Sequence, residues 1–288
     1  MSQFFVYQAY GRPEFYLECV YSILSLLRFY NEGPPPFKIF VYTDNKQAMQ
    51  GKLPESVEFI ELPAGQFQAW RGDIDFVHRV KVEMLRDFTK RVSGSIIYVD
   101  TDTYFLKDPA PIFEKIGKGT RFLHLLEDRV DSKSNPILKK MYRFLKKRIF
   151  SLKDGRNVKM PVSVEMWNAG LIGFSSQDKS LLEDVLELTD LMYSQYEKHV
   201  MEQLAFSFVL QTEGSLLPAE DYVYHYWAHK DFRNAIESFF AETKAMPLPD
   251  VVQATEKLNP ANEKPEPRRS RWRVFHKILN VGGVAERP

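Results

Sequence analysis

The chain has 288 residues, of which 44% are hydrophobic and 27% are charged, and its formal net charge at pH 7 is +1. This is the composition of a globular protein that can bury a sizeable core. The single cysteine, Cys19, excludes an internal disulfide framework and a cysteine-rich zinc or iron–sulfur site. No run of about 20 apolar residues is present to span a bilayer, and the start of the chain does not resemble a signal peptide, so we expect a cytoplasmic protein.

The small net charge conceals two basic segments. Positions 129–160 hold eleven lysines and arginines against two aspartates, and positions 264–279 hold six basic residues against one glutamate. Because the whole chain carries +1, these local balances of +9 and +5 leave −13 for the remaining residues. An acidic body with two basic appendages usually reflects binding partners rather than fold.

Strands and helices alternate in the amino-terminal part of the chain. This order predicts an α/β fold in which helices cover both faces of a parallel sheet. By hydrophobic pattern, the expected strands are 3–11, 38–45, 57–63 and 95–106, and the expected helices are 13–30 and 76–92.

The carboxyl-terminal part continues with a mixture of elements. Its expected strands are 121–128, a long strand or hairpin over 162–176 and a short strand at 222–227, and its expected helices are 137–150, 178–197 and 200–212. From residue 244 onward, proline and charged residues predict an extended or disordered basic tail, which includes a short amphipathic helix over 268–279.

Two carboxylates, Asp100 and Asp102, interrupt the apolar stretch 95–106. A carboxylate removed from water costs several kcal/mol unless a positive group meets it. Ligands of open parallel sheets bind beyond the carboxyl ends of the strands, and two acids one residue apart can reach one Mg²⁺ or Mn²⁺ ion there. The pair therefore predicts a metal site that leaves positions open for phosphate oxygens.

The same Asp-X-Asp motif also occurs in phosphatases, which use it for a different reaction. Haloacid-dehalogenase-like phosphatases carry Asp-X-Asp after an apolar strand, which would make Asp100 a nucleophile and Asp102 a general acid. That motif normally lies on the first strand and needs a downstream lysine and a Gly-Asp loop. Here it follows the fourth expected strand, and the Gly-Asp pair at 72–73 lies upstream.

Four motifs in order carry a resemblance to a known family. They are "IIYVDTD" at 96–102, "WNAGLIGF" at 167–174, "MEQLAF" at 201–206 and "YVYHYWAHK" at 222–230. Over about residues 3–230 the chain resembles nucleotide-sugar-dependent glycosyltransferases of the GT-A fold, and is most similar to the group of bacterial lipopolysaccharide galactosyltransferases and glycogenin. The resemblance implies a Rossmann-like fold with a mixed, mostly parallel central sheet flanked by helices. It implies a catalytic domain over 1–243, with a nucleotide-binding half about 1–106 and an acceptor half about 107–243, before the tail 244–288.

The resemblance also implies a metal centre. Asp100, Asp102 and His225 would bind Mn²⁺ or Mg²⁺, which bridges the donor diphosphate and stabilises the charge on the departing nucleotide. Lys230 would contact that diphosphate, although Ala228 replaces the glycine that the family carries in this segment.

The donor that the resemblance implies is a UDP-sugar, which would lie along the sheet edge. By the same resemblance, the base and ribose would be bound by Gln8, Ala9, Tyr10 and Asp44. The phosphates and sugar would be bound by Lys81, Thr101, Asn168, Ala169 and Gly170. Glu202 and Gln203 match residues beside the anomeric carbon. The family group retains configuration, so retention is expected, with Asp128 as the candidate base if the enzyme inverts.

The two basic segments suggest a membrane partner. The helix 137–150 and the tail segment 268–279 combine cations with apolar and aromatic residues, as in helices that bind anionic membranes, while an apolar stripe docked on the body is the alternative. We expect a saccharide acceptor, lipid-linked or phosphorylated, at the inner face of the membrane, and no nucleic-acid partner. A fold that binds a sugar nucleotide or a membrane without turnover is a further alternative.

Overall fold

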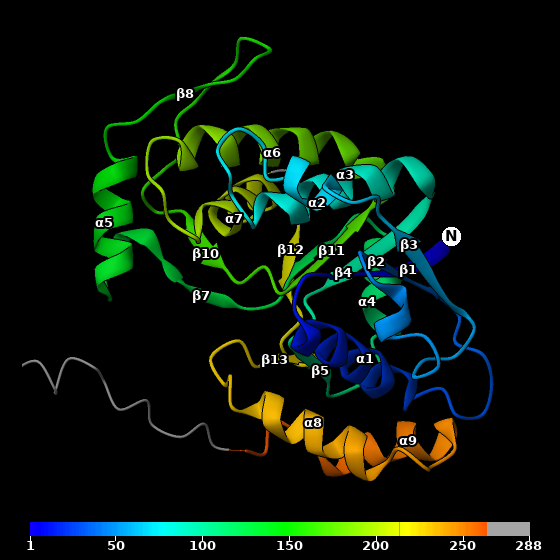
Figure 1. Ribbon diagram of the computed structural model, residues 1–288. Helices are drawn as coiled ribbons and strands as arrows, with labels where there is room; N and C mark the ends of the chain where they lie inside the picture. Colours follow the sequence, from blue (N-terminus) through cyan, green and yellow to red (C-terminus); the bar gives the residue numbers. More distant parts are fainter. Residues whose placement is uncertain (213, 264–288) are drawn as a thin grey trace, which may run out of the picture.

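A seven-stranded sheet with the order β12-β6-β11-β4-β1-β2-β3 organises the computed structural model, which describes residues 1–212 and 214–263 (Figure 1). Strands β3, β2, β1 and β4 are parallel, β11 runs antiparallel to both β4 and β6, and β12 is parallel to β6. The expected mixed, mostly parallel sheet is confirmed. Its strands are β1 (Ser2–Ala9), β2 (Lys38–Thr43), β3 (Val57–Glu61), β4 (Gly94–Val99), β6 (Arg121–Leu123), β11 (Leu171–Ser175) and β12 (Leu216–Pro218).

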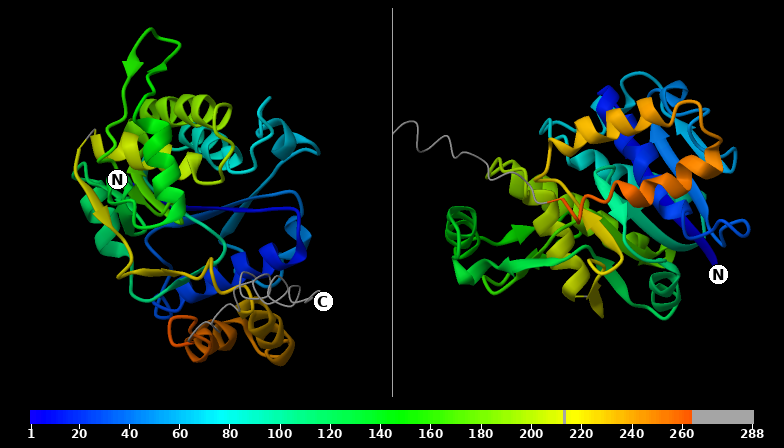
Figure 2. Two further views of the ribbon diagram at one scale, coloured as in Figure 1. Left: turned by 90° about the vertical axis from the view of Figure 1, so that its left-hand side faces the viewer. Right: turned by 90° about the horizontal axis from the view of Figure 1, so that it is seen from below.

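Helices cover both faces of this sheet, as the alternation of strands and helices predicts (Figures 1 and 2). Along β1, Phe4 and Val6 join one hydrophobic cluster, and Phe5 and Tyr7 join the other, because successive side chains of a strand point to opposite faces. The first cluster also contains side chains of α2 (Gln66–Ala69), α3 (Arg79–Arg91), α5 (Pro136–Leu145), α6 (Lys179–Tyr193) and α7 (Met201–Thr212). The second contains side chains of α1 (Pro13–Leu27), α4 (Ala110–Ile116), α8 (Phe232–Glu242) and α9 (Leu248–Ala254).

Three long strands expected from the sequence are broken into shorter ones. The stretch 95–106 forms β4 and then β5 (Thr103–Phe105), which leaves the main sheet and pairs with β13 (Val223–His225). The stretch 121–128 forms β6 and then β7 (Leu126–Arg129), and 162–176 forms β10 (Glu165–Trp167) and β11. Strand β10 pairs with β7 while β11 lies between β4 and β6, so the two are not a hairpin. Each break places polar residues at the carboxyl edge of β4.

The basic helix is shorter than the expected 137–150. Helix α5 ends at Leu145, and Phe150 is a buried residue of β8 (Phe150–Ser151), which pairs with β9 (Asn157–Val158). The expected helix was too long because Phe150 continues the apolar pattern of the helix, although its buried side chain belongs to a strand. Figure 1 shows α5 and this small hairpin at the outer edge of the molecule.

The expectation of an extended tail from residue 244 is wrong for residues 248–257. Helix α9 forms there and packs on α1, with Val251 and Val252 each 8% exposed. The sequence predicted no helix here because the prolines nearby favour an extended chain, and two adjacent valines are too short an apolar pattern to indicate a helix.

The amphipathic helix expected at 268–279 lies outside the described residues. The division into halves at 106 and the domain boundary at 243 remain predictions. No helix of the described part is long and apolar enough to cross a bilayer.

The packing of α9 can be tested by placing a charge in it. Val251→Asp would bury a carboxylate against α1, which costs several kcal/mol, so we expect the free energy of unfolding to fall by about 3 kcal/mol or more. Gln253→Asp introduces a carboxylate at an exposed position of the same helix and should leave stability almost unchanged. Urea denaturation of the full chain measures both, and equal effects would contradict a docked α9.

Candidate functional site

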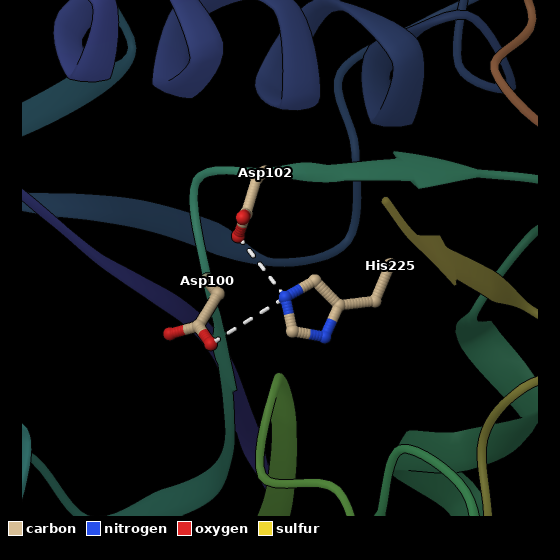
Figure 3. Close-up of side chains that lie close together, drawn as sticks. All are labelled: Asp100, Asp102 and His225. Atoms are coloured by element: carbon tan, nitrogen blue, oxygen red, sulfur yellow. Dashed lines mark hydrogen bonds and ion pairs between the residues drawn. The ribbon is translucent and has the colours of Figure 1, made fainter. Parts of the chain in front are cut away.

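Three potential metal ligands meet at the carboxyl end of β4. Asp100 and Asp102 lie on the turn between β4 and β5, and His225 comes from β13 (Figure 3). The Nε2 atom of His225 lies 3.0 Å from Asp102 Oδ1 and 3.8 Å from Asp100 Oδ2. One ligand atom from each residue can be chosen so that all lie within 4.8 Å of one another. The structure thus brings together the three residues that the sequence nominated as ligands.

Local hydrogen bonds hold this turn in place. Thr103 donates from Oγ1 to the Asp100 carbonyl at 2.8 Å, and its hydroxyl lies 2.7 Å from that of Ser22 on α1. The backbone N–H of Tyr226 donates to the carbonyl of Asp102 at 3.0 Å. Because β5 and β13 pair in a register that sets His225 opposite Thr103, the histidine lies beside Asp102, from which it is separated by 123 positions in the sequence.

Positive groups from three elements compensate the two carboxylates. Lys81 of α3 lies 3.3 Å from Asp100, and Lys230 lies 3.4 Å from Asp102. Burial alone would raise the pKa of Asp102, but the charges of His225 and Lys230 outweigh burial and hold this pKa below its usual range. Burial lowers the pKa of His225, and the facing Asp102 more than reverses that effect. Asp102 is therefore ionised, and each of the two partly buried carboxylates is paired with a positive group.

Lys81 also connects the acidic pair to Glu202. Its ammonium donates to the Ala169 carbonyl at 3.0 Å and lies 3.2 Å from Glu202, which is 3% exposed at the start of α7. Burial raises the pKa of Glu202 to about 7, although Lys81 opposes this shift. Lys81 itself is buried, and its two acidic neighbours raise its pKa despite that burial. It is an internal cation rather than a surface lysine.

The loop between β10 and β11 supplies small and polar residues. Asn168 accepts from the Gly170 N–H at 2.9 Å and contacts Nδ1 of His225 at 2.9 Å. A Cβ atom on Gly170 would lie only 2.1 Å from that Nδ1, so only glycine permits the close approach of the histidine. Ala169 is buried beside it.

Glu127 is a site residue that the sequence interpretation missed. It accepts hydrogen bonds from Asn168 at 3.0 Å and from Gln203 at 2.9 Å. The predicted base, Asp128, instead accepts from Ser134 and from the Arg129 N–H, and both acids line a cavity of about 210 Å³ beside α5. Neighbouring residues of a strand point in opposite directions, and the alternation in 126–129 alone does not say which of the two acids faces the site.

The residues expected around the base and ribose end the parallel strands β1 and β2 at the same edge. The ring of Tyr10 stacks on Phe67 with centroids 4.0 Å apart, and its pKa is raised to about 12, mainly by burial. Asp44 is exposed and accepts from Tyr16 at 2.6 Å and from the Gly11 N–H at 3.1 Å. Gln8 carries a buried side-chain oxygen without a hydrogen-bond partner, next to the buried Ala9. Thr101 is partly exposed between the two aspartates.

The donor set fits a hard divalent cation. Two carboxylates and one imidazole are ligands that Mn²⁺ and Mg²⁺ accept, and they leave coordination positions for phosphate oxygens. Ligand atoms within 4.8 Å of one another are close enough to share one ion. Among the residues described, this group is the one with the composition and spacing of a metal site.

Comparison with known proteins gives structural likeness without sequence likeness. No protein-family model matches the sequence, and no curated protein matches it. Similar solved structures include an active-site mutant of LgtC (11% identity, 75% of this chain, 72% of the other, TM-score 0.49). They also include the galactosyltransferase LgtC with donor and acceptor sugar analogues (12% identity, 98% of each chain, TM-score 0.48). A third is mouse xyloside xylosyltransferase 1 in its apo form (11% identity, 76% of this chain, 85% of the other, TM-score 0.48). We therefore infer function from the side chains of the site.

The raised pKa of Glu202 makes stability depend on pH. A carboxyl group whose pKa rises from 4.5 unfolded to about 7 folded adds stability below pH 4.5, and loses it as pH rises through 7. A shift of this size corresponds to about 3 kcal/mol. The unfolding free energy of the wild type minus that of Glu202→Gln should therefore fall by about that amount between pH 4.5 and pH 8. Denaturation series at several pH values measure this difference, and a pH-independent difference would contradict it.

Proposed function

We propose that this protein is a metal-dependent glycosyltransferase that moves a hexose from a nucleotide sugar, a UDP-sugar, to a saccharide acceptor. The observation that supports this most directly is the convergence of Asp100, Asp102 and His225 at the carboxyl end of β4, with Lys81 and Lys230 beside them. These residues would hold Mn²⁺ or Mg²⁺, which when bound stabilises the negative charge of a departing nucleoside diphosphate.

Lys230 is suited to the diphosphate because its side chain is half exposed while its ammonium already lies at the metal-binding carboxylate of Asp102. A cation in the site would neutralise Asp102 and free this ammonium for a phosphate oxygen. Lys81 is buried, lies 3.3 Å from Asp100 and would hold that carboxylate in place.

The nucleoside would lie at the ends of β1 and β2. Gln8 offers a buried amide oxygen without a partner, which can accept from an N–H of the base. Tyr10 offers an aromatic ring for stacking, and Asp44 offers carboxylate oxygens at an exposed position for ribose hydroxyls. Ala9 and Thr101 would contribute backbone and small side-chain surface along the same edge.

Transfer with retention is the stereochemistry that we favour. In such a transfer the bond from the sugar's anomeric carbon to the phosphate oxygen breaks, the acceptor oxygen forms the new bond on the same face, and the acceptor proton passes to the leaving phosphate. No protein base is then required. Gln203, held by Glu127, and Glu202, paired with Lys81, would face the reacting sugar. Both oxygens of Asp128 are engaged elsewhere, which does not favour it as an inverting base.

The phosphatase alternative predicts different surroundings for Asp100. Its acidic loop would have to bring a further carboxylate to the pair, whereas the third potential ligand among the described residues is His225. Asp73 of the upstream Gly-Asp pair is exposed on the segment between α2 and α3. A phosphatase would also form an acyl-phosphate at Asp100, which beryllofluoride traps.

Loss of one ligand provides the decisive test. In Asp102→Asn, the ion loses a charged ligand, so Mn²⁺ affinity and Mn²⁺-stimulated hydrolysis of a UDP-sugar should both fall by about 100-fold or more. Calorimetry with Mn²⁺ and release of UDP measure the two quantities, and Asp73→Asn is the matched control. Unchanged hydrolysis in Asp102→Asn would discard the metal role, and UDP binding without turnover on any acceptor would favour a non-catalytic protein.

We further propose that the enzyme works peripherally at the cytoplasmic face of an anionic membrane, where its acceptor is lipid-linked or phosphorylated. The supporting observation is the surface of α5 and the turn that follows it. The apolar residues Leu138, Met141, Phe144 and Leu145 are buried on the body, while all six cations between 139 and 148 are exposed. No acidic residue occurs from 132 to 153, and Ile149 is 61% exposed among the cations.

Vesicle sedimentation tests this contact. Each lysine at an anionic surface contributes about 1 kcal/mol, so serine at Lys139, Lys140, Lys146 and Lys147 should weaken binding to phosphatidylglycerol-containing vesicles by roughly 100-fold or more. The control variant replaces Lys90, Lys107, Lys115 and Lys118, which are exposed elsewhere. Equal binding by both variants, or equal binding to vesicles of neutral phosphatidylcholine, would refute the proposed contact.

A further inference from the structure

The side-chain amide of Asn168 lies between the metal-ligand candidate His225 and Glu127. Its Nδ2 donates to Glu127 Oε1 at 3.0 Å, and its Oδ1 accepts from the Gly170 N–H at 2.9 Å. The reverse orientation would set an amide NH₂ against the Gly170 N–H and a carbonyl against a carboxylate. Both contacts would be repulsive, so chemistry fixes which atom of the amide faces which neighbour.

This orientation also fixes the role of each ring nitrogen of His225. Oδ1 of Asn168 can only accept, so Nδ1 of His225, 2.9 Å away, must carry a proton and donate it. The other nitrogen, Nε2, is the one that faces both aspartates. It is therefore the atom left to bind a cation, and ligating histidines characteristically have their second nitrogen fixed in this way.

Two further contacts keep the ring in this position. Gly170 leaves room for Nδ1, since a Cβ atom there would lie 2.1 Å from it. The ring of His124 packs edge-on against that of His225, with centroids 5.5 Å apart and an interplanar angle of 86°. His124 is itself held by a contact of 2.8 Å between its Nε2 and the Val223 carbonyl. The imidazole thus has one favoured position and one favoured tautomer.

We propose that Asn168 is a positioning residue that fixes His225 as a metal ligand and links it to Glu127 and Gln203 at the reacting face. This inference rests on the proposed metal site and goes beyond the resemblance, which directs Asn168 to the donor sugar. Both lone pairs of its Oδ1 are used by the protein, and the residue is only 6% exposed. The carbonyl therefore has no lone pair left for a sugar hydroxyl. The chain Gln203, Glu127, Asn168, His225 joins the sugar end of the site to its metal end through hydrogen bonds of 2.9 to 3.0 Å.

The first test is the affinity for Mn²⁺ alone, measured by calorimetry on the full chain. Asn168→Ala removes the acceptor for Nδ1 and should weaken Mn²⁺ binding by about 10- to 100-fold, the usual effect of losing such a partner. Asn157→Ala removes an asparagine that also makes a side-chain hydrogen bond, but in the distant β8–β9 hairpin, and should leave the affinity unchanged. UDP affinity in the absence of metal should be similar in all three proteins.

A compensating pair of substitutions separates this role from simple structural damage. Asn168→Asp alone keeps an acceptor for His225 but sets a carboxylate against Glu127. Combined with Glu127→Gln, whose amide can donate to the new carboxylate and still accept from Gln203, it should recover most of the lost Mn²⁺ affinity. Failure of the double variant to recover affinity, while its thermal unfolding matches the wild type, would overturn the proposal.

The tautomer gives a readout that needs no variant at all. With ¹⁵N-labelled histidine and diamagnetic Mg²⁺ bound, His225 should show its proton on Nδ1, and a proton on Nε2 would overturn the proposal. So would an Asn168→Ala protein that binds Mn²⁺ like the wild type but loses the preference for UDP-sugar over UDP, because that result assigns Asn168 to the sugar. A wild-type protein that binds neither Mn²⁺ nor Mg²⁺ would instead refute the proposed metal site on which this role depends.

Discussion

Compensation of two negative charges at the end of one strand is the constraint on which the site depends. Asp100 and Asp102 sit where β4 leaves the sheet, and partly buried acids at that place require positive partners. The partners come from α3, from β13 and from the segment before α8, so three distant parts of the chain must be brought to this edge. The pairing of β5 with β13 meets that requirement for His225, and the bidentate pair of Arg233 with the buried Glu18 ties the start of α8 to α1 close to Lys230.

The sequence supplied most of the fold because the signals were local. The strands β1 to β4, the helices α1, α3, α6 and α7, and the position of the acidic pair all follow from periodicity and from the switch between strand and helix patterns. Breaks within strands were harder to predict. Asp100, His124 and Asn168 each end a strand that an apolar pattern continues, since the polar residue serves a long-range contact that no local window contains. Helix α9 was missed for a related reason, because its two valines are recognisable as core residues only once α1 is known to pack against them.

The site could be predicted in part. Asp100, Asp102 and His225 were identified from residue type and from resemblance, and the structure brings them together. The roles of the surrounding residues depend on directions that a sequence does not contain. Asp128 and Glu127 are adjacent acids in one strand, yet Glu127 is the one bonded to Asn168 and Gln203. Likewise the sequence leaves open whether Lys81 is a surface lysine of an amphipathic helix, and only its contacts with Glu202 of α7 and with the Ala169 carbonyl make it an internal cation.

Charge clusters elsewhere in the molecule show why geometry rather than charge identifies the site. On the same helix as Lys81, Arg79 pairs with Glu83 and with Asp190 of α6, and Arg86 pairs with Glu83 and with Glu183 of α6. These pairs clamp two helices together, and Glu183 stays 57% exposed. Every group there has a protein partner of opposite charge, arranged along a helix interface. At the end of β4, by contrast, two acids and an imidazole converge on one point, a glycine is required to admit the ring, and a hydrogen-bonded amide selects the nitrogen that faces the acids. A clamp needs none of these three features, whereas an outer partner that fixes the second ring nitrogen is characteristic of histidines that bind metals.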